Sequence, residues 1–144
     1  MLNIKTSSSD ETKKTAEKFA KKLRGGEVIA LIGDLGAGKT TFVKGIAKGL
    51  GIKQNITSPT FVLIKEYQVE CWKTQVKSLI HIDCYRMRYI KDALSFGITD
   101  YIGKKDVIVL IEWADKISKI LPKNIIKIKF KHLNQNKRKI IISP

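Results

Sequence analysis

The chain has few cysteines, prolines and acidic side chains, and it has no long apolar run. Its 144 residues include two Cys, three Pro and 13 Asp+Glu. Two cysteines without metal-ligand spacing exclude a disulfide scaffold and a cysteine-based metal site. No run approaches the roughly 18 apolar residues of a transmembrane helix, and residues 1–10 lack the apolar core of a signal peptide. We therefore expect one domain over residues 1–144, located in the cytoplasm and without a membrane partner.

Basic side chains greatly outnumber acidic ones. Lys+Arg total 28, which gives a formal net charge of +15 and a pI near 9.9. Such a charge favours phosphate-rich partners, because Lys and Arg displace counterions from nucleic acid. All but four of these residues are lysines, however, and lysine is also the usual residue of a solvated surface. An anion-binding surface and a merely soluble one therefore both stay open.

Short apolar runs alternate with segments of helical periodicity. Residues 8–23 combine a capping box with an apolar stripe at helical spacing, residues 43–50 carry a second such stripe, and residues 93–96 suggest a short helix. This alternation indicates an α/β fold with a mainly parallel central sheet flanked by helices. The last two runs read as an antiparallel C-terminal hairpin. The expected strands are Leu2–Lys5, Glu27–Ile32, Phe61–Tyr67, Leu79–Asp83, Val107–Ile111, Ile125–Lys131 and Lys139–Ile142.

Residues 33–40 match the pattern G-x-x-x-x-G-K-[ST] at every position, which is the phosphate-binding P-loop. The context also fits, because an apolar strand precedes the motif and an amphipathic helix follows it. Gly36 and Gly38 let backbone N–H groups turn toward phosphate oxygens without a Cβ clash. The positive end of the new helix points at the same oxygens. The residues of the motif are Gly33, Asp34, Leu35, Gly36, Ala37, Gly38, Lys39 and Thr40.

The motif predicts that the phosphates of a nucleotide and Mg²⁺ bind here. We expect Lys39 to reach the β- and γ-phosphates, Thr40 to ligate Mg²⁺ and Thr41 to reach the α-phosphate. Phosphoryl transfer also needs carboxylates, which in P-loop proteins lie at the ends of strands beside the loop. Asp83 and Glu112 each end an apolar run. Two such residues beside a complete P-loop predict a metal-assisted site rather than two solvated side chains.

The sequence indicates roles for two further residues near these motifs, on weaker grounds than for the P-loop. Thr60 lies between the P-loop helix and the next strand, where switch loops of nucleotide-binding proteins sense the γ-phosphate. A simple turn residue after Pro59 is the alternative. His81 is interpreted as a satisfied structural histidine that faces a helix.

Five segments, in this order and spacing, resemble the TsaE (YjeE) family, and they extend over nearly the whole chain. The P-loop alone is unspecific, whereas the other four segments are more specific. The resemblance implies a P-loop NTPase-like fold and a small bacterial ATPase required for threonylcarbamoyladenosine (t6A) modification at adenosine 37 of tRNA. Cys84 replaces an apolar residue of the family, but cysteine is itself a small, commonly buried residue. The segments are Gly33–Thr41, Ser58–Phe61, His81–Arg86, Gly97–Tyr101 and Glu112–Trp113.

The resemblance also implies roles for individual residues. Lys39 and the loop amides would hold ATP, and Thr40, Asp83 and Glu112 would serve Mg²⁺ and its water shell. Lys39 and Glu112 are the catalytic candidates, with Glu112 orienting the attacking water. Thr60 would be the switch-loop residue.

Further residues are placed around the nucleotide by the same resemblance. Trp113 would lie beside the nucleotide pocket, with a core aromatic residue as the alternative interpretation. Ser9 and Thr12 would lie near the adenine. Lys137 or Arg138 would close the site from the C-terminal hairpin.

The family implies the TsaD and TsaB proteins as partners. TsaD transfers the threonylcarbamoyl group, TsaB is its paralogous scaffold, and ATP hydrolysis by TsaE resets their complex. We therefore expect weak ATPase activity alone and stimulation by the partners. The basic surface would then engage tRNA or an acidic partner, and the sequence does not separate the two.

Two other functions fit parts of the sequence. A P-loop small-molecule kinase would need a mobile lid with several arginines, but the chain has four arginines and no Arg-rich segment. A nucleic-acid-binding module would need stacking aromatics on a basic face, and the aromatics here lie mostly in apolar runs. The sequence therefore favours an ATPase over both.

Overall fold

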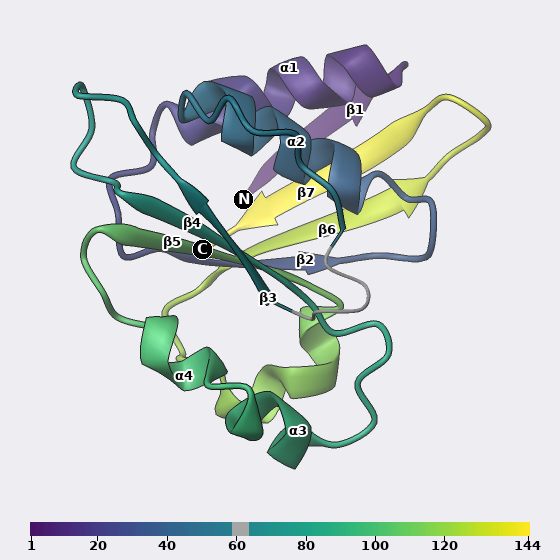
Figure 1. Cartoon of the computed structure of the whole chain (residues 1–144). Coiled ribbons are helices and arrows are strands. Elements are labelled where there is room, and N and C mark those ends of the chain that lie inside the picture. Colours follow the sequence, from purple (N-terminus) through teal and green to yellow (C-terminus); the bar gives the residue numbers. More distant parts are fainter. Residues whose placement is uncertain (59–63) are drawn as a thin grey trace.

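The computed structural model describes residues 1–58 and 64–144, which form one mixed sheet with helices on both faces (Figure 1). The expected α/β fold is confirmed. The strands are β1 (Leu2–Thr6), β2 (Val28–Ile32), β3 (Ile64–Gln68), β4 (Ser78–Asp83), β5 (Val107–Glu112), β6 (Ile126–His132) and β7 (Arg138–Ser143). The helices are α1 (Ser9–Ala20), α2 (Lys39–Gly49), α3 (Ile90–Ser95), α4 (Ile98–Tyr101) and the 3₁₀ helix η1 (Ala114–Ile120).

The four central strands are parallel, as expected. Within the described ranges the strand order is β1-β7-β6-β2-β5-β4-β3, in which β6, β2, β5 and β4 run parallel. The predicted hairpin of β6 and β7 is confirmed, with β1 pairing antiparallel beyond it. At the opposite margin β3 is antiparallel to β4, which the sequence analysis did not anticipate. Of the strand expected at Phe61–Tyr67, residues 61–63 lie outside the described residues.

Side chains of the central strands enter two cores, one on each face of the sheet. On β2, Ile29 and Leu31 pack with α1 and α2, whereas Val28 and Ala30 pack on the face of α3, α4 and η1. Every residue of β4 and β5 is buried. Burial on both faces explains why these strands read as continuous apolar runs rather than as alternating patterns.

The first helix is capped as its sequence predicts. The backbone N–H of Glu11 donates to the Ser8 hydroxyl at 3.1 Å, while the Glu11 carboxylate accepts from the backbone N–H of Ser7. Helix α1 ends at Ala20 rather than at Leu23, which is still buried in the turn that follows. The cap fixes the start of α1 beside the P-loop. No helix in the described ranges is long and apolar enough to span a membrane.

Helices α1 and α2 lie side by side over the sheet and approach each other through small residues (Figure 1). A Cβ built on Gly45 would lie 2.4 Å from the Lys13 carbonyl oxygen and 2.5 Å from the Ala16 Cβ. One turn later, a Cβ on Gly49 would lie 2.6 Å from the Ala20 Cβ. The two glycines therefore allow a close helix contact, which holds α2 and the P-loop before it in place.

We expect Gly45→Ala to destabilise the protein by about 1–3 kcal/mol, because the added methyl overlaps backbone that cannot yield. Thermal and urea unfolding followed by circular dichroism measures the change. The neighbouring Lys44 is exposed on the same helix, and Lys44→Ala should stay within about 0.5 kcal/mol of the wild type. Equal stability of Gly45→Ala and the wild type would contradict the close packing.

Candidate nucleotide site

A cavity of about 460 Å³ lies at the carboxyl edge of the parallel strands, next to the start of α2. Ligands of open α/β sheets bind at this edge. The structure thus brings most of the expected site residues together around one space. Those that line it are Leu35, Gly36, Gly38, Lys39, Thr40, Thr41, Asp83, Glu112 and Trp113. The expected switch residue Thr60 lies outside the described residues.

The loop between β2 and α2 has the backbone that a P-loop needs. Gly36 and Gly38 have φ of 76° and 104°, and nothing lies within 4 Å of a Cβ built on Gly36. Residues with a side chain rarely adopt this conformation, so the backbone of the loop requires glycine at these two positions. Gly33 is required for another reason, because a Cβ there would lie 2.9 Å from the Phe130 carbonyl oxygen of β6. Ala37 is buried behind the loop.

Lys39, the first residue of α2, is folded back over its own loop. Its ammonium donates to the carbonyl oxygens of Gly33 at 2.5 Å and Asp34 at 2.7 Å, and lies 4.4 Å from the ring centre of Trp113. Burial lowers the pKa of Lys39, while the nearby carboxylates, Glu112 first, act to raise it. A bound phosphate would offer this ammonium a better counter-charge than two carbonyl oxygens do.

Glu112 is the centre of a buried polar cluster. The Thr40 hydroxyl donates to its two carboxylate oxygens at 3.0 and 3.3 Å, and His81 Nε2 lies 2.8 Å from Oε1. Glu112 is 3 % exposed and His81 is wholly buried. The carboxylate is therefore held between α2 and β4, with a fixed position beside the P-loop.

His81 differs from the satisfied structural histidine that the sequence suggested. Its Nδ1 is buried and has no hydrogen-bond partner among the described residues. Only Nε2 is paired, and its partner is Glu112. His81 thus helps to hold Glu112 in place. The sequence of β4 alone did not reveal this contact, because it depends on the register between β4 and β5.

Asp83 lies directly beside Glu112, because the two residues are register partners on the parallel strands β4 and β5. Its carboxylate accepts from the Ser58 hydroxyl at 2.7 Å and from the backbone N–H of Tyr85 at 2.9 Å. Ser58 therefore connects the segment after α2 to the carboxylate.

The polar atoms of this cluster fit a hard cation such as Mg²⁺. Mg²⁺ prefers oxygen ligands, keeps several waters and takes one or two carboxylates together with substrate phosphates. Thr40, Asp83 and Glu112 offer only oxygens. The described residues hold no group of three or more His, Cys, Asp or Glu side chains placed to bind a metal.

Trp113 follows β5 and has an unusual backbone. Its φ of 57° is in the left-handed region, and its N–H donates to the Leu31 carbonyl oxygen at 3.1 Å. The ring lies 5.0 Å from that of Tyr85 and faces the ammonium of Lys39. Trp113 lines the cavity, so it is not solely a core aromatic. Tyr85, which the sequence analysis did not single out, also lines it.

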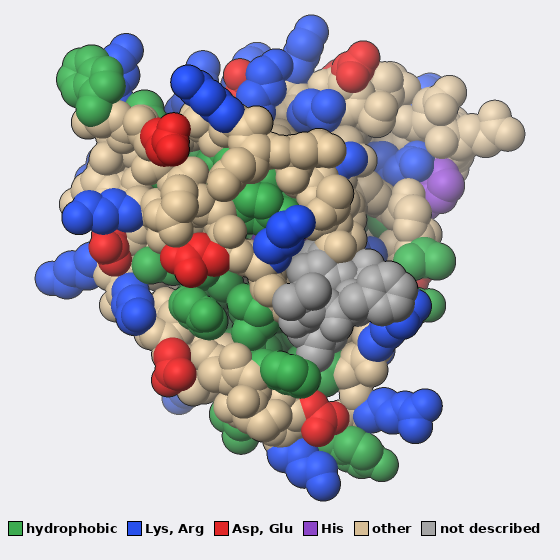
Figure 2. Space-filling view, in the orientation of Figure 1, with side chains coloured by type: hydrophobic (Ala, Val, Ile, Leu, Met, Phe, Trp, Pro, Cys, Tyr) green, Lys and Arg blue, Asp and Glu red, His purple; other side chains and the backbone are tan. Residues whose placement is uncertain are grey.

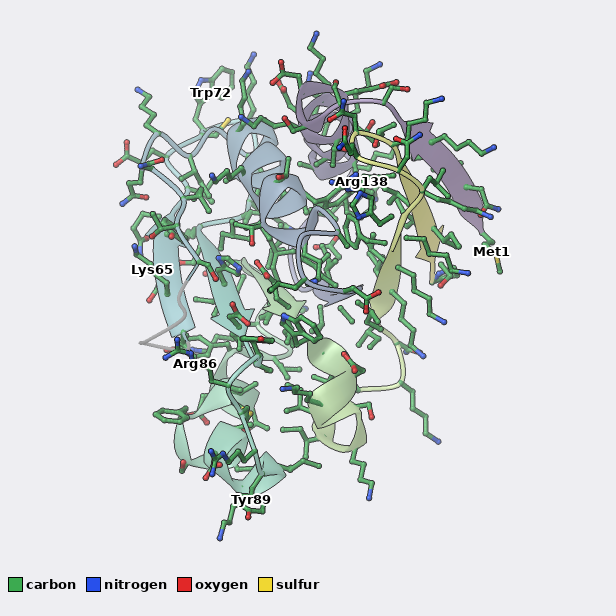
Figure 3. All side chains as sticks on the ribbon, turned by 90° about the vertical axis from the view of Figure 1, so that its right-hand side faces the viewer. Met1, Lys65, Trp72, Arg86, Tyr89 and Arg138 are labelled. Carbon is green, nitrogen blue, oxygen red and sulfur yellow. The ribbon has the colours of Figure 1, made fainter. Side chains whose placement is uncertain are left out.

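The start of α1 and the β6–β7 hairpin form the far side of the cavity. Ser9 and Thr12 line it, as does Arg138, which lies near α1 in Figure 3. Arg138 donates through Nη2 to the Gly36 carbonyl oxygen at 3.3 Å. Of the two alternatives on the hairpin, Arg138 reaches the P-loop, whereas Lys137 is not among the described residues that line the cavity.

Cys84, which directly follows β4, is buried in the core. Burial, with a smaller contribution from the neighbouring carboxylate of Asp83, raises the pKa of the Cys84 thiol to about 12. It therefore stays protonated at neutral pH and packs as an apolar side chain in the core.

Comparison with known proteins gives a consistent result. The family model "Threonylcarbamoyl adenosine biosynthesis protein TsaE" matches residues 6–140. Two relatives are called "tRNA threonylcarbamoyladenosine biosynthesis protein TsaE". The protein from Bacillus subtilis is 40 % identical, and the match covers 96 % of this chain and 83 % of that protein. The protein from Aquifex aeolicus is 42 % identical, and the match covers 94 % of this chain and 90 % of that protein. The crystal structure of B. subtilis YdiB superposes with a TM-score of 0.73 at 36 % identity, covering 96 % of this chain and 82 % of that one.

Proposed function

This chain belongs to the TsaE family of threonylcarbamoyl adenosine biosynthesis proteins, and from that membership we propose that it is an ATPase supporting t6A modification of tRNA. The observation that carries the ATPase assignment is the hydrogen bond from Thr40 of the P-loop to Glu112 at the end of β5. It joins a phosphate-binding loop to a buried carboxylate, which is the pairing that nucleotide hydrolysis needs.

The loop amides and Lys39 would bind the phosphates of ATP. The ammonium lies at the mouth of the loop and would exchange the carbonyl oxygens of Gly33 and Asp34 for phosphate oxygens. The Thr40 hydroxyl donates its hydrogen to Glu112, so its lone pairs remain available to a cation. Thr40 and Asp83 would hold Mg²⁺ or its waters, and the ion would supply positive charge against the phosphates when bound.

Glu112 would orient the attacking water. It is an acceptor fixed by Thr40 on one side and His81 on the other, so it can accept a water hydrogen without first having to move. Asp83 is bonded to Ser58 and to the backbone of Tyr85, and it faces the same space. This division gives Glu112 the catalytic role and Asp83 the role of serving the cation.

The distribution of arginines disfavours a kinase. A phosphoryl-transfer lid needs several arginines around the transferred group. Among the described residues, Arg138 is the arginine that lines the cavity, and it approaches Gly36 at the outer edge of the loop. Hydrolysis, with water as the acceptor, therefore remains the better proposal.

We extend the proposal to TsaD and TsaB as partners that complete the site. Leu35 at the tip of the P-loop is 73 % exposed, so the loop is open on this side. An open site has little of its own to exclude water or to stabilise the transition state. A docked partner would supply both, and Ser58 would connect the segment before Thr60 to Asp83.

The deciding experiment titrates purified TsaD–TsaB into the protein while phosphate release is followed. We expect slow hydrolysis alone, a rise of at least about tenfold at saturation, and tighter association with ATP than with ADP. In the same titration, the association of the Thr60→Ala protein with TsaD–TsaB should differ less between ATP and ADP than that of the wild type. A flat rate, with equal partner affinity in ATP and ADP, would contradict partner-stimulated hydrolysis.

A further inference from the structure

The part of the sheet formed by β6, β7 and β1 is covered by helices on one face only. Along β6, Ile128 and Phe130 are buried in the core below α1 and α2, whereas Lys127, Lys129 and Lys131 alternate with them and are exposed. In Figure 1, helices α3 and α4 lie under the other half of the sheet. Within the described ranges no helix covers the lysine-bearing side of these three strands.

Lysines on neighbouring strands stand directly opposite one another on this side. Lys131 of β6 is the register partner of Lys139 of β7, which in turn is the partner of Lys5 of β1. Adjacent strands are only about 4.8 Å apart. Three like charges in one row destabilise a sheet, because each repels the next. Folding therefore concentrates positive charge here although it lowers stability.

No acidic side chain offsets this charge locally. Strands β1, β6 and β7 contain no Asp or Glu, and residues 116–144 contain nine Lys or Arg and no acid at all. Elsewhere the two signs are mixed, as on the face seen in Figure 2, where acidic side chains lie among the basic ones. On β1, β6 and β7, the side away from α1 and α2 thus carries charge of one sign. We call it the lysine face; it consists of Lys5, Lys127, Lys129, Lys131 and Lys139.

We propose that the lysine face binds the phosphate backbone of an RNA stem. Ammonium groups act as point charges for phosphates, and each neutralised phosphate releases counterions. The core of a protein–protein interface is rich in aromatic and apolar anchors and poor in lysine, and this face offers only the half-buried Ile141. It presents no aromatic ring from the described strands on which an unpaired base could stack. Backbone contact with a helical stem, independent of its sequence, is the mode that fits.

The lysine face is separate from the nucleotide cavity, because none of its five lysines lines that cavity. RNA binding there needs no bound or hydrolysed ATP, so the inference goes beyond the proposed function. It can be tested with variants that leave the P-loop and both carboxylates untouched.

The test compares two triple variants of equal charge. One replaces Lys127, Lys129 and Lys131 of the face by Gln, and the matched control replaces Lys14, Lys18 and Lys22, which are exposed on or just after α1. Both change the formal charge from +15 to +12. Affinity for a fluorescein-labelled tRNA transcript is measured by anisotropy between about 50 and 200 mM salt.

We expect the triple variant of the lysine face, here called the face triple, to lose at least about tenfold in affinity for the tRNA and about three units of the slope of log Kd against log salt. The control triple should lose less than about threefold in affinity. Equal losses in the two triples, or none in either, would overturn the proposal. So would a polyglutamate peptide that competes as strongly as unlabelled tRNA, since an acidic protein would then be the partner.

Thermal melting checks that the variants fold. Because the face triple removes like-charge repulsion, its Tm at low salt should be at least that of the control triple. If it does not fold, Lys5→Gln combined with Lys139→Gln is measured in the same way, with Lys14→Gln combined with Lys18→Gln as its control. The expected loss of slope is then about two units, and the other criteria are unchanged.

Discussion

Lys39→Ala should abolish nearly all ATP hydrolysis while leaving the fold intact. The ammonium contacts two carbonyl oxygens of the P-loop, and it would compensate phosphate charge in the ground and transition states. Removing such a group from a preorganised site costs about 10²–10³ in rate. Stability should change little, because the buried ammonium loses hydration that its two carbonyl contacts only partly replace, as the lowered pKa of Lys39 indicates.

Phosphate release and the binding of a fluorescent ATP analogue measure the effect, and thermal melting verifies the fold. Lys44→Ala, on the exposed side of the same helix, is the matched control and should retain wild-type turnover. Normal turnover in a folded Lys39→Ala protein would disprove the assignment of the loop as a phosphate site.

Glu112→Gln should bind ATP almost normally but hydrolyse it about 10²–10⁴-fold more slowly. The amide keeps the shape of the side chain and removes the charge that accepts a water hydrogen, which matters mainly in the transition state. Asp83→Asn is the informative comparison, because its carboxylate contacts Ser58 and the Tyr85 backbone rather than Thr40. That variant should instead weaken binding that depends on Mg²⁺.

Single-turnover hydrolysis and nucleotide titrations with and without Mg²⁺ separate the two carboxylates. His81 lies 2.8 Å from Glu112, so melting of the Glu112→Gln protein must be compared with the wild type before rates are interpreted. If both variants hydrolyse ATP at the wild-type rate, the two carboxylates are structural and the proposed division of roles is wrong.

The helices, the strands and the position of the site at the carboxyl edge of the sheet could be predicted from the sequence, because local patterns indicate them. Gly33–Thr40 forms a contiguous motif, and Asp83 and Glu112 each end an apolar run, so the rule for parallel strands brings them together. The capping role of Ser8 could be predicted because Glu11 follows only three residues later. Each of these inferences depends on residues close in sequence or on a general property of parallel sheets.

The remaining features depend on contacts between distant segments. The bond from Thr40 to Glu112 spans 72 residues and that from His81 to Glu112 spans 31, and both require the register of β4, β5 and α2. Arg138 reaches Gly36 across 102 residues. Likewise, no local pattern shows that one face of the β6–β7 hairpin lacks a covering helix.

The backbone at Trp113 has a consequence for which residues this position can accept. Trp113 is the one described non-glycine residue with a positive φ, and a left-handed conformation costs about 1–2 kcal/mol for a residue with a side chain. Glycine would adopt this conformation without strain, but it would also lose the packing of the Trp113 side chain against the core. Glycine would remove the ring that lies between Lys39 and Tyr85. The ring is therefore held in the site by a strained backbone, and such strain is typical of binding sites.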